Sequence, residues 1–156
     1  MLLRQGPDKL PRSWSVFFAA LVTSLLVSIV ASEIVSTDIV PMHDVTLFLT
    51  ILNVAFYYAV LRVAGYPQRF LQSAIAILGA DALLTICYLS GFLAIELIAD
   101  RLTAIWLAWF ISCWSVSVEG HIIARAIGRH WLVGIVIALA SYILLLLTYW
   151  QMTGIP

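Results

Sequence analysis

One acidic residue, Asp81, lies inside an otherwise apolar stretch, AILGADALLTICY at residues 76–88. A carboxyl group in such a setting can exchange a proton, bind a cation, or donate a hydrogen bond that holds helices together. Each role requires polar partners at a similar depth. Counting inward from the ends of the neighbouring apolar segments, we expect such an intramembrane polar cluster around Asp81, formed by Asn53, Ser112, Ser115, Ser141 and Tyr142.

Asp81 admits two interpretations. As a transport residue, it would bind a proton or cation in a small proton-coupled transporter or channel. As a structural residue, it would stay protonated and donate a hydrogen bond to Asn53 or a serine, worth ~1 kcal/mol. The sequence favours the structural interpretation, because no basic residue and no second acid are expected at the same depth. Nor is there a pair of helix-breaking motifs of the kind found at transporter binding sites.

The elements that position these residues follow from the composition. The chain of 156 residues is 63% hydrophobic and 10% charged, with a mean hydropathy of +1.07. A bilayer core of ~30 Å is crossed by about 20 apolar residues in a helix. We therefore predict an all-α integral membrane protein, a single transmembrane bundle over 1–156 with helices at 14–36, 45–64, 70–95, 102–124 and 131–151.

The basic residues predict the orientation of the bundle. Under the five-helix arrangement, one side receives seven of the eight basic residues, namely Arg4, Lys9, Arg12, Arg62, Arg69, Arg125 and Arg129, and the other receives Arg101. Basic loops stay in the cytoplasm, so we expect a cytoplasmic N-terminus and an external C-terminus. The short loops and this bias indicate a multi-pass protein of a bacterial inner membrane. The net charge of +0 gives no reason to expect nucleic-acid binding.

Small residues recur at intervals of four in two segments. In a helix such residues share one face and let a neighbouring helix approach closely. We expect a helix-packing seam that includes Ser24, Ser28 and Ser32 in the first segment and Gly120, Ala124 and Gly128 in the fourth. The seam is expected to join helices of this chain rather than two copies of it.

A second group of charged residues lies where the basic loops meet the membrane. It consists of Arg62, Arg69, Glu119, His121, Arg125 and Arg129. The simpler interpretation is an ion pair of Glu119 with Arg62 or Arg125 at the headgroup level. The alternative is a patch that binds lipid headgroups or a protein partner. The three histidines lack metal-ligand spacing, and we expect no metal site and no cofactor.

The connection between the second and third segments reads RVAGYPQRFLQS, at residues 62–73. Gly65 is expected to end one helix and Pro67 to prevent its continuation, so the two helices form a tight hairpin. This glycine turn, followed by Arg-Phe-x-Gln and AILGADALL, resembles the middle of the Yip-domain membrane proteins. The resemblance implies five crossings, a cytoplasmic N-terminus and a role in binding partners, and it supplies no catalytic residue.

The sequence therefore favours an interaction function over catalysis. It has no glycine-rich phosphate loop, no H-E-x-x-H and no G-x-S-x-G motif, and we do not expect an enzyme. Its loops are too short to form a soluble binding module. We expect an accessory, scaffold or assembly subunit that contacts the lipid bilayer and other membrane proteins or itself, and the alternative is the transporter or channel that uses Asp81.

Overall fold

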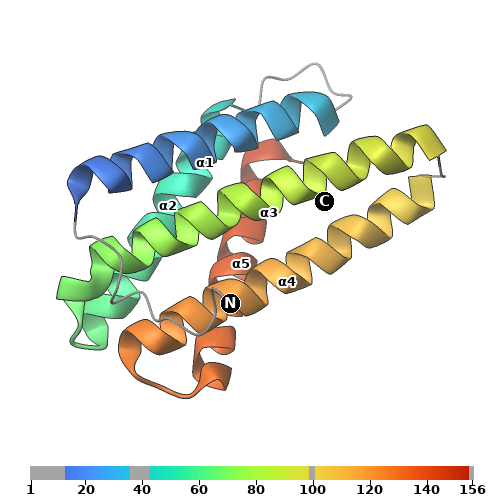
Figure 1. Ribbon diagram of the computed structural model, residues 1–156. Helices are drawn as coiled ribbons and strands as arrows, with labels where there is room; N and C mark the ends of the chain where they lie inside the picture. Colours follow the sequence, from blue (N-terminus) through green and yellow to red (C-terminus); the bar gives the residue numbers. More distant parts are fainter. Residues whose placement is uncertain (1–12, 36–42, 99–100, 155–156) are drawn as a thin grey trace.

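The described part of the chain folds into five long helices. The computed structural model describes residues 13–35, 43–98 and 101–154. These residues form α1 (Trp14–Val35), α2 (His43–Val63), a short 3-10 helix η3 (Pro67–Arg69), α3 (Phe70–Ile98), α4 (Arg101–Ile127) and α5 (Trp131–Thr153) (Figure 1). Each long helix coincides with an apolar span of 20 to 29 residues, enough to cross a bilayer, and the span at α3 begins at Pro67 in η3. The prediction of five helices long and apolar enough to cross a membrane is thus confirmed for the described residues.

Helix α3 is the centre of the bundle. Helices α1, α3 and α4 run side by side, with α3 in the middle, and α2 and α5 lie behind them (Figure 1). Of the five apolar spans, that of α3 has the largest buried share. Helix α5 covers α4 and reaches α2. A polar residue on α3 can therefore meet side chains from several other helices.

Glycines end α2 and α4 in the same way. Gly65 and Gly128 have φ angles of 85° and 65°, a left-handed conformation that costs glycine little. The N–H groups of the residues that follow them, Tyr66 and Arg129, donate to carbonyls five residues back at 2.9 Å, so both ends are Schellman motifs. Assigning Gly128 to the packing seam was wrong, because a Cβ there would have no neighbour within 4 Å.

The connections α2–α3 and α4–α5 meet at one end of the bundle, which we call the basic end after Arg62, Arg69, Arg125 and Arg129. The guanidinium of Arg69 donates from Nη1 to the carbonyl oxygen of Ala126 at 2.9 Å. It also lies over the ring of Tyr66, 5.0 Å from the centroid. A cation at the C-terminal end of a helix is stabilised by the unpaired carbonyls there. Arg69 therefore fastens the α2–α3 turn to the end of α4.

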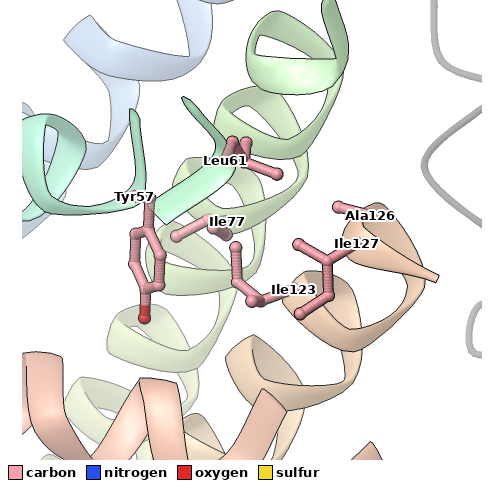
Figure 2. Close-up of a cluster of buried hydrophobic side chains, with 6 residues drawn as sticks. All are labelled: Tyr57, Leu61, Ile77, Ile123, Ala126 and Ile127. Atoms are coloured by element: carbon pink, nitrogen blue, oxygen red, sulfur yellow. The ribbon is translucent and has the colours of Figure 1, made fainter. Parts of the chain in front are cut away.

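An apolar cluster joins α2, α3 and α4 near the basic end. Figure 2 shows its six buried side chains, which are Tyr57, Leu61, Ile77, Ile123, Ala126 and Ile127. A second cluster places Phe17 of α1 against Ala74, Ile75 and Leu78 of α3. The two clusters hold four helices in fixed rotation about their axes. They thereby decide which polar side chains point inward.

Helices α4 and α5 approach each other so closely at Gly120 and Gly134 that neither position has room for a Cβ atom. A Cβ added to Gly134 would run into the carbonyl oxygen of Gly120 and lie 2.8 Å from the Cβ of Ala124. A Cβ on Gly120 would in turn lie 2.8 Å from the backbone of Ile135. The predicted seam at Gly120 and Ala124 therefore lies in a helix contact. Its partner, Gly134 with Ala138 on α5, has the same spacing of four and was missed from the sequence.

The small face of α1 is only partly a packing seam. Ser24 is buried, Ser28 and Ser32 are half-buried, and Ala31 is also buried. The hydroxyl of Ser32 donates to the carbonyl oxygen of Ile29 in its own helix at 2.8 Å. On this face, Ser24 makes an interhelical hydrogen bond, and its partner is Asp81.

Candidate functional site

Asp81 receives its hydrogen bond from α1. Ser24 Oγ donates to Asp81 Oδ2 at 2.6 Å, and Ser24 is 1% exposed. Asp81 lies eleven residues after Phe70, about 16 Å along α3, and Ser24 lies ten residues after Trp14, about 15 Å along α1. Within the described chain, no hydrogen bond reaches the other oxygen, Oδ1. A serine partner was one of the two expected, but Ser24 had been assigned to packing.

A cavity of about 360 Å³ lies between α3 and α4. It is lined by Asp81, Leu84, Thr85, Tyr88, Ala108, Ile111, Ser112, Ser115 and Tyr142. The structure thus gathers four members of the expected polar cluster around one space, namely Asp81, Ser112, Ser115 and Tyr142. No basic side chain lines this cavity.

Ser112 and Ser115 of α4 present hydroxyl oxygens to the cavity that can accept hydrogen bonds, because their hydrogens are already donated elsewhere. Ser112 Oγ donates to the carbonyl oxygen of Ala108 at 2.9 Å, and Ser115 Oγ donates to Glu119 Oε1 at 3.3 Å. A serine hydroxyl has a single hydrogen to donate and can still accept. The cavity therefore combines one carboxyl group, several acceptor oxygens and the two tyrosines Tyr88 and Tyr142.

Asn53 does not bond to Asp81. Its Oδ1 accepts a hydrogen bond from Ser141 Oγ at 2.8 Å, which joins α2 to α5. Ser141 is 1% exposed, so this pair lies in the interior. Asn53 and Ser141, both expected near Asp81, bond to each other, and the rotation of α2 about its axis directs Asn53 to this partner.

Glu119 also lies inside the bundle. Tyr57 donates from its hydroxyl to Glu119 Oε2 at 2.5 Å, and Ser115 donates to Oε1. The expected ion pair with Arg62 or Arg125 at the headgroup level is therefore wrong. Glu119 lies eight residues before Ile127, about 12 Å from the end of α4, and faces α2 because the cluster with Ile123 fixes the rotation of α4.

Asp81 and Glu119 form a pair of interior acids. Their depths from the basic end, about 16 and 12 Å, differ by less than one helical turn. The sequence-based argument that Asp81 has no second acid near it does not hold. Proton pathways through membrane proteins use interior carboxyl groups such as these.

A series of hydroxyl groups leads away from Glu119. Ser141 Oγ donates its hydrogen to Asn53 Oδ1 and lies near the hydroxyl of Tyr57. Each hydroxyl has one hydrogen to donate. When Glu119 is ionised, Tyr57 donates to it; when Glu119 is protonated, Glu119 can donate to Tyr57, Tyr57 to Ser141, and Ser141 to Asn53. The direction of the series can therefore follow the protonation of Glu119.

The remaining members of the expected charged patch lie at the basic end. Arg62, Arg125 and Arg129 are exposed there, and His121 is half-buried. Arg69 is engaged by Ala126 and Tyr66. Without Glu119, the patch consists of three exposed arginines with the half-buried Arg69 and His121 beside them.

No family model, no curated protein and no solved structure matches the chain.

Proposed function

We propose that this protein is a small proton-linked membrane transporter. In this proposal, Asp81 exchanges a bound proton for a solute that enters the cavity. The observation that carries the proposal is a carboxyl group lining a cavity of about 360 Å³ midway along an apolar bundle, with no basic side chain in its lining. An intramembrane acid is costly, and one that faces a cavity can bind a proton or a cation.

Glu119 supports the proposal. An acid about one turn from Asp81 in depth, with Tyr57, Ser141 and Asn53 beyond it, offers a second proton site and a series of hydroxyls. The structural interpretation of Asp81 rested partly on the absence of such a group. A structural residue also needs no cavity, whereas a transport residue requires one.

The test is proton movement in proteoliposomes. With a pH-sensitive dye inside and an imposed pH gradient, we expect the wild-type chain to speed dissipation several-fold over protein-free vesicles, alone or on addition of small amines, sugars or amino acids. Asp81→Asn should remove the increase, because a carboxamide does not take up or release a proton near neutral pH. The matched control, Asp44→Asn, changes an exposed acid at the start of α2 and should leave flux unchanged.

Equal flux from wild-type and Asp81→Asn vesicles would contradict the transport proposal. So would the absence of flux under every condition from wild-type protein shown to be folded. Asp81 would then be a hydrogen-bonded packing residue attached to Ser24.

A role as an accessory, scaffold or assembly subunit is the second candidate. The outer face of α4 carries a groove of about 400 Å³ lined by Phe110, Cys113, Trp114 and Ser117, and Phe110 and Trp114 are exposed. A helix of another membrane protein or of a second copy could fill it. The resemblance to Yip-domain proteins, carried by the hairpin, belongs with this candidate. The test is co-purification of a partner with the wild-type protein and with Trp114→Ala in mild detergent. We expect the partner to be lost from Trp114→Ala.

The proposed orientation places the basic end in the cytoplasm, most simply at a bacterial inner membrane. It is supported by the exposed Arg62, Arg125 and Arg129 at that end. We expect a reporter inserted at Gln68 to be active only if it works in the cytoplasm, and one fused after Pro156 only if it works outside. Reporters active on the same side of the membrane would refute the orientation and the number of crossings together.

A further inference from the structure

We infer that the cavity between α3 and α4 binds a small monovalent organic cation, an ammonium group with an apolar body. The inference rests on the proposed function, since it names the class of solute that Asp81 would exchange for a proton. It depends on the charge, the aromatic lining and the size of the cavity, each of which restricts the ligand independently.

The charge of Asp81 is only partly compensated by the protein. Ser24 donates one hydrogen bond to Oδ2, no hydrogen bond from the described residues reaches Oδ1, and the cavity lining has no basic side chain. An ionised carboxylate in an apolar interior is stable only beside a compensating charge or water. A cationic ligand supplies that charge, and an anionic or neutral ligand does not.

Aromatic rings favour an organic cation over a hydrated ion. Tyr88 follows Asp81 by seven residues, two helical turns, so the two side chains share one face of α3, with Thr85 between them. Tyr142 of α5 also lines the cavity. The faces of tyrosine rings attract ammonium groups, and proteins bind quaternary ammonium ligands through aromatic side chains.

The composition of the cavity argues against a divalent metal ion. Ca²⁺ and Mg²⁺ take six or more oxygen ligands, usually with more than one carboxylate, and Zn²⁺ takes four ligands that are mostly Cys and His. Asp81 is the one carboxylate of the lining, while Leu84, Ala108 and Ile111 make much of the wall apolar. With a volume of about 360 Å³, the cavity lies near the lower end of ligand pockets, which span roughly 300–1,000 Å³. A compact amine with one ring satisfies both limits.

The cation and a proton should compete for Asp81. The other groups around it are Tyr88 on the same helix, Ser24 of α1, Ser115 and Glu119 of α4, and Tyr142 of α5. The acidic groups among these are the carboxyl groups of Asp81 and Glu119. Cation binding should therefore release a proton when Asp81 is protonated beforehand, and affinity should fall as the pH is lowered.

The test uses the whole protein in nanodiscs of zwitterionic lipid, titrated by calorimetry with benzyltrimethylammonium. The matched ligand is neopentylbenzene, in which a carbon atom replaces the charged nitrogen, and empty nanodiscs correct for partitioning into lipid. We expect saturable binding of the cation, at least about tenfold tighter than that of the neutral compound, as one charge–charge contact provides. Heats measured in two buffers of different ionisation enthalpy should show proton release.

Variants assign the binding to the cavity. Asp81→Asn should weaken cation binding by about tenfold or more and abolish proton release, and Tyr88→Leu should weaken it by about fivefold, while Asp44→Asn should change neither. Equal affinity of the wild-type protein for the charged and neutral ligands, a comparison that needs no variant, would overturn the inference, as would an absence of saturable binding. Binding is measured without a pH gradient, so the binding and flux assays can fail separately. Proton flux without cation binding refutes this inference alone. Cation binding without proton flux refutes the proposed transport alone.

Discussion

The Gly134→Ala substitution is expected to lower the stability of the bundle by about 1–3 kcal/mol, the usual cost of forcing an extra methyl group into a packed contact. The new Cβ would meet the carbonyl oxygen of Gly120, which belongs to the α4 backbone and cannot rotate away. Helices α4 and α5 would have to separate and lose contacts along the seam. Thermal unfolding in mild detergent, followed by circular dichroism, should show a lower midpoint.

Gly79→Ala is the matched control for this prediction. Gly79 also lies inside a helix, but a Cβ there meets nothing within 4 Å. The same chemical change should leave stability unchanged or raise it slightly, because alanine favours the helix over glycine. The reciprocal variant, Gly120→Ala, should resemble Gly134→Ala, since its Cβ would lie 2.8 Å from the backbone of Ile135. If Gly134→Ala and Gly79→Ala unfold at the same temperature, the close approach of α4 and α5 is wrong.

Loss of the Tyr57 hydroxyl should also be costly. Tyr57→Phe keeps the ring in the apolar cluster and removes the donor to Glu119 Oε2. A carboxyl group that loses its partner in an interior site costs about 1–3 kcal/mol. The matched control is Tyr58→Phe, the same change at the next residue, where the side chain is exposed and its ring contact with Phe70 is retained. Denaturant unfolding of both variants should show a loss for Tyr57→Phe alone.

A double-mutant cycle separates the hydrogen bond from other effects of the Tyr57 change. In a Glu119→Leu background, Tyr57→Phe should cost much less than in the wild-type protein, with a coupling energy of about 0.5–3 kcal/mol. Additive effects of the two substitutions would mean that Tyr57 and Glu119 do not interact. Glu119 would then be free to reach the arginines of the basic end, and the second proton site of the transport proposal would be lost.

The sequence by itself determined the helices and the depth of their polar residues. A bilayer demands helices of about 20 apolar residues, so the long apolar runs could be recognised without knowing their neighbours. Gly65 and Pro67 marked the hairpin between α2 and α3 because they act on the local backbone. Depth follows from counting residues at 1.5 Å each. For this reason Ser112, Ser115 and Tyr142 were expected at the level of Asp81, and they line its cavity.

Only the tertiary structure decided which way each polar side chain points. A helix in lipid is apolar on every face, so its sequence pattern carries little information about its rotation, which is set by packing against other helices. That rotation turns Asn53 to Ser141, Ser24 to Asp81, and Glu119 to Tyr57. The same cause explains Gly134, whose role is visible only beside Gly120. Depth is a property of one helix and can be counted along the chain, whereas the direction of a side chain is a property of several helices together.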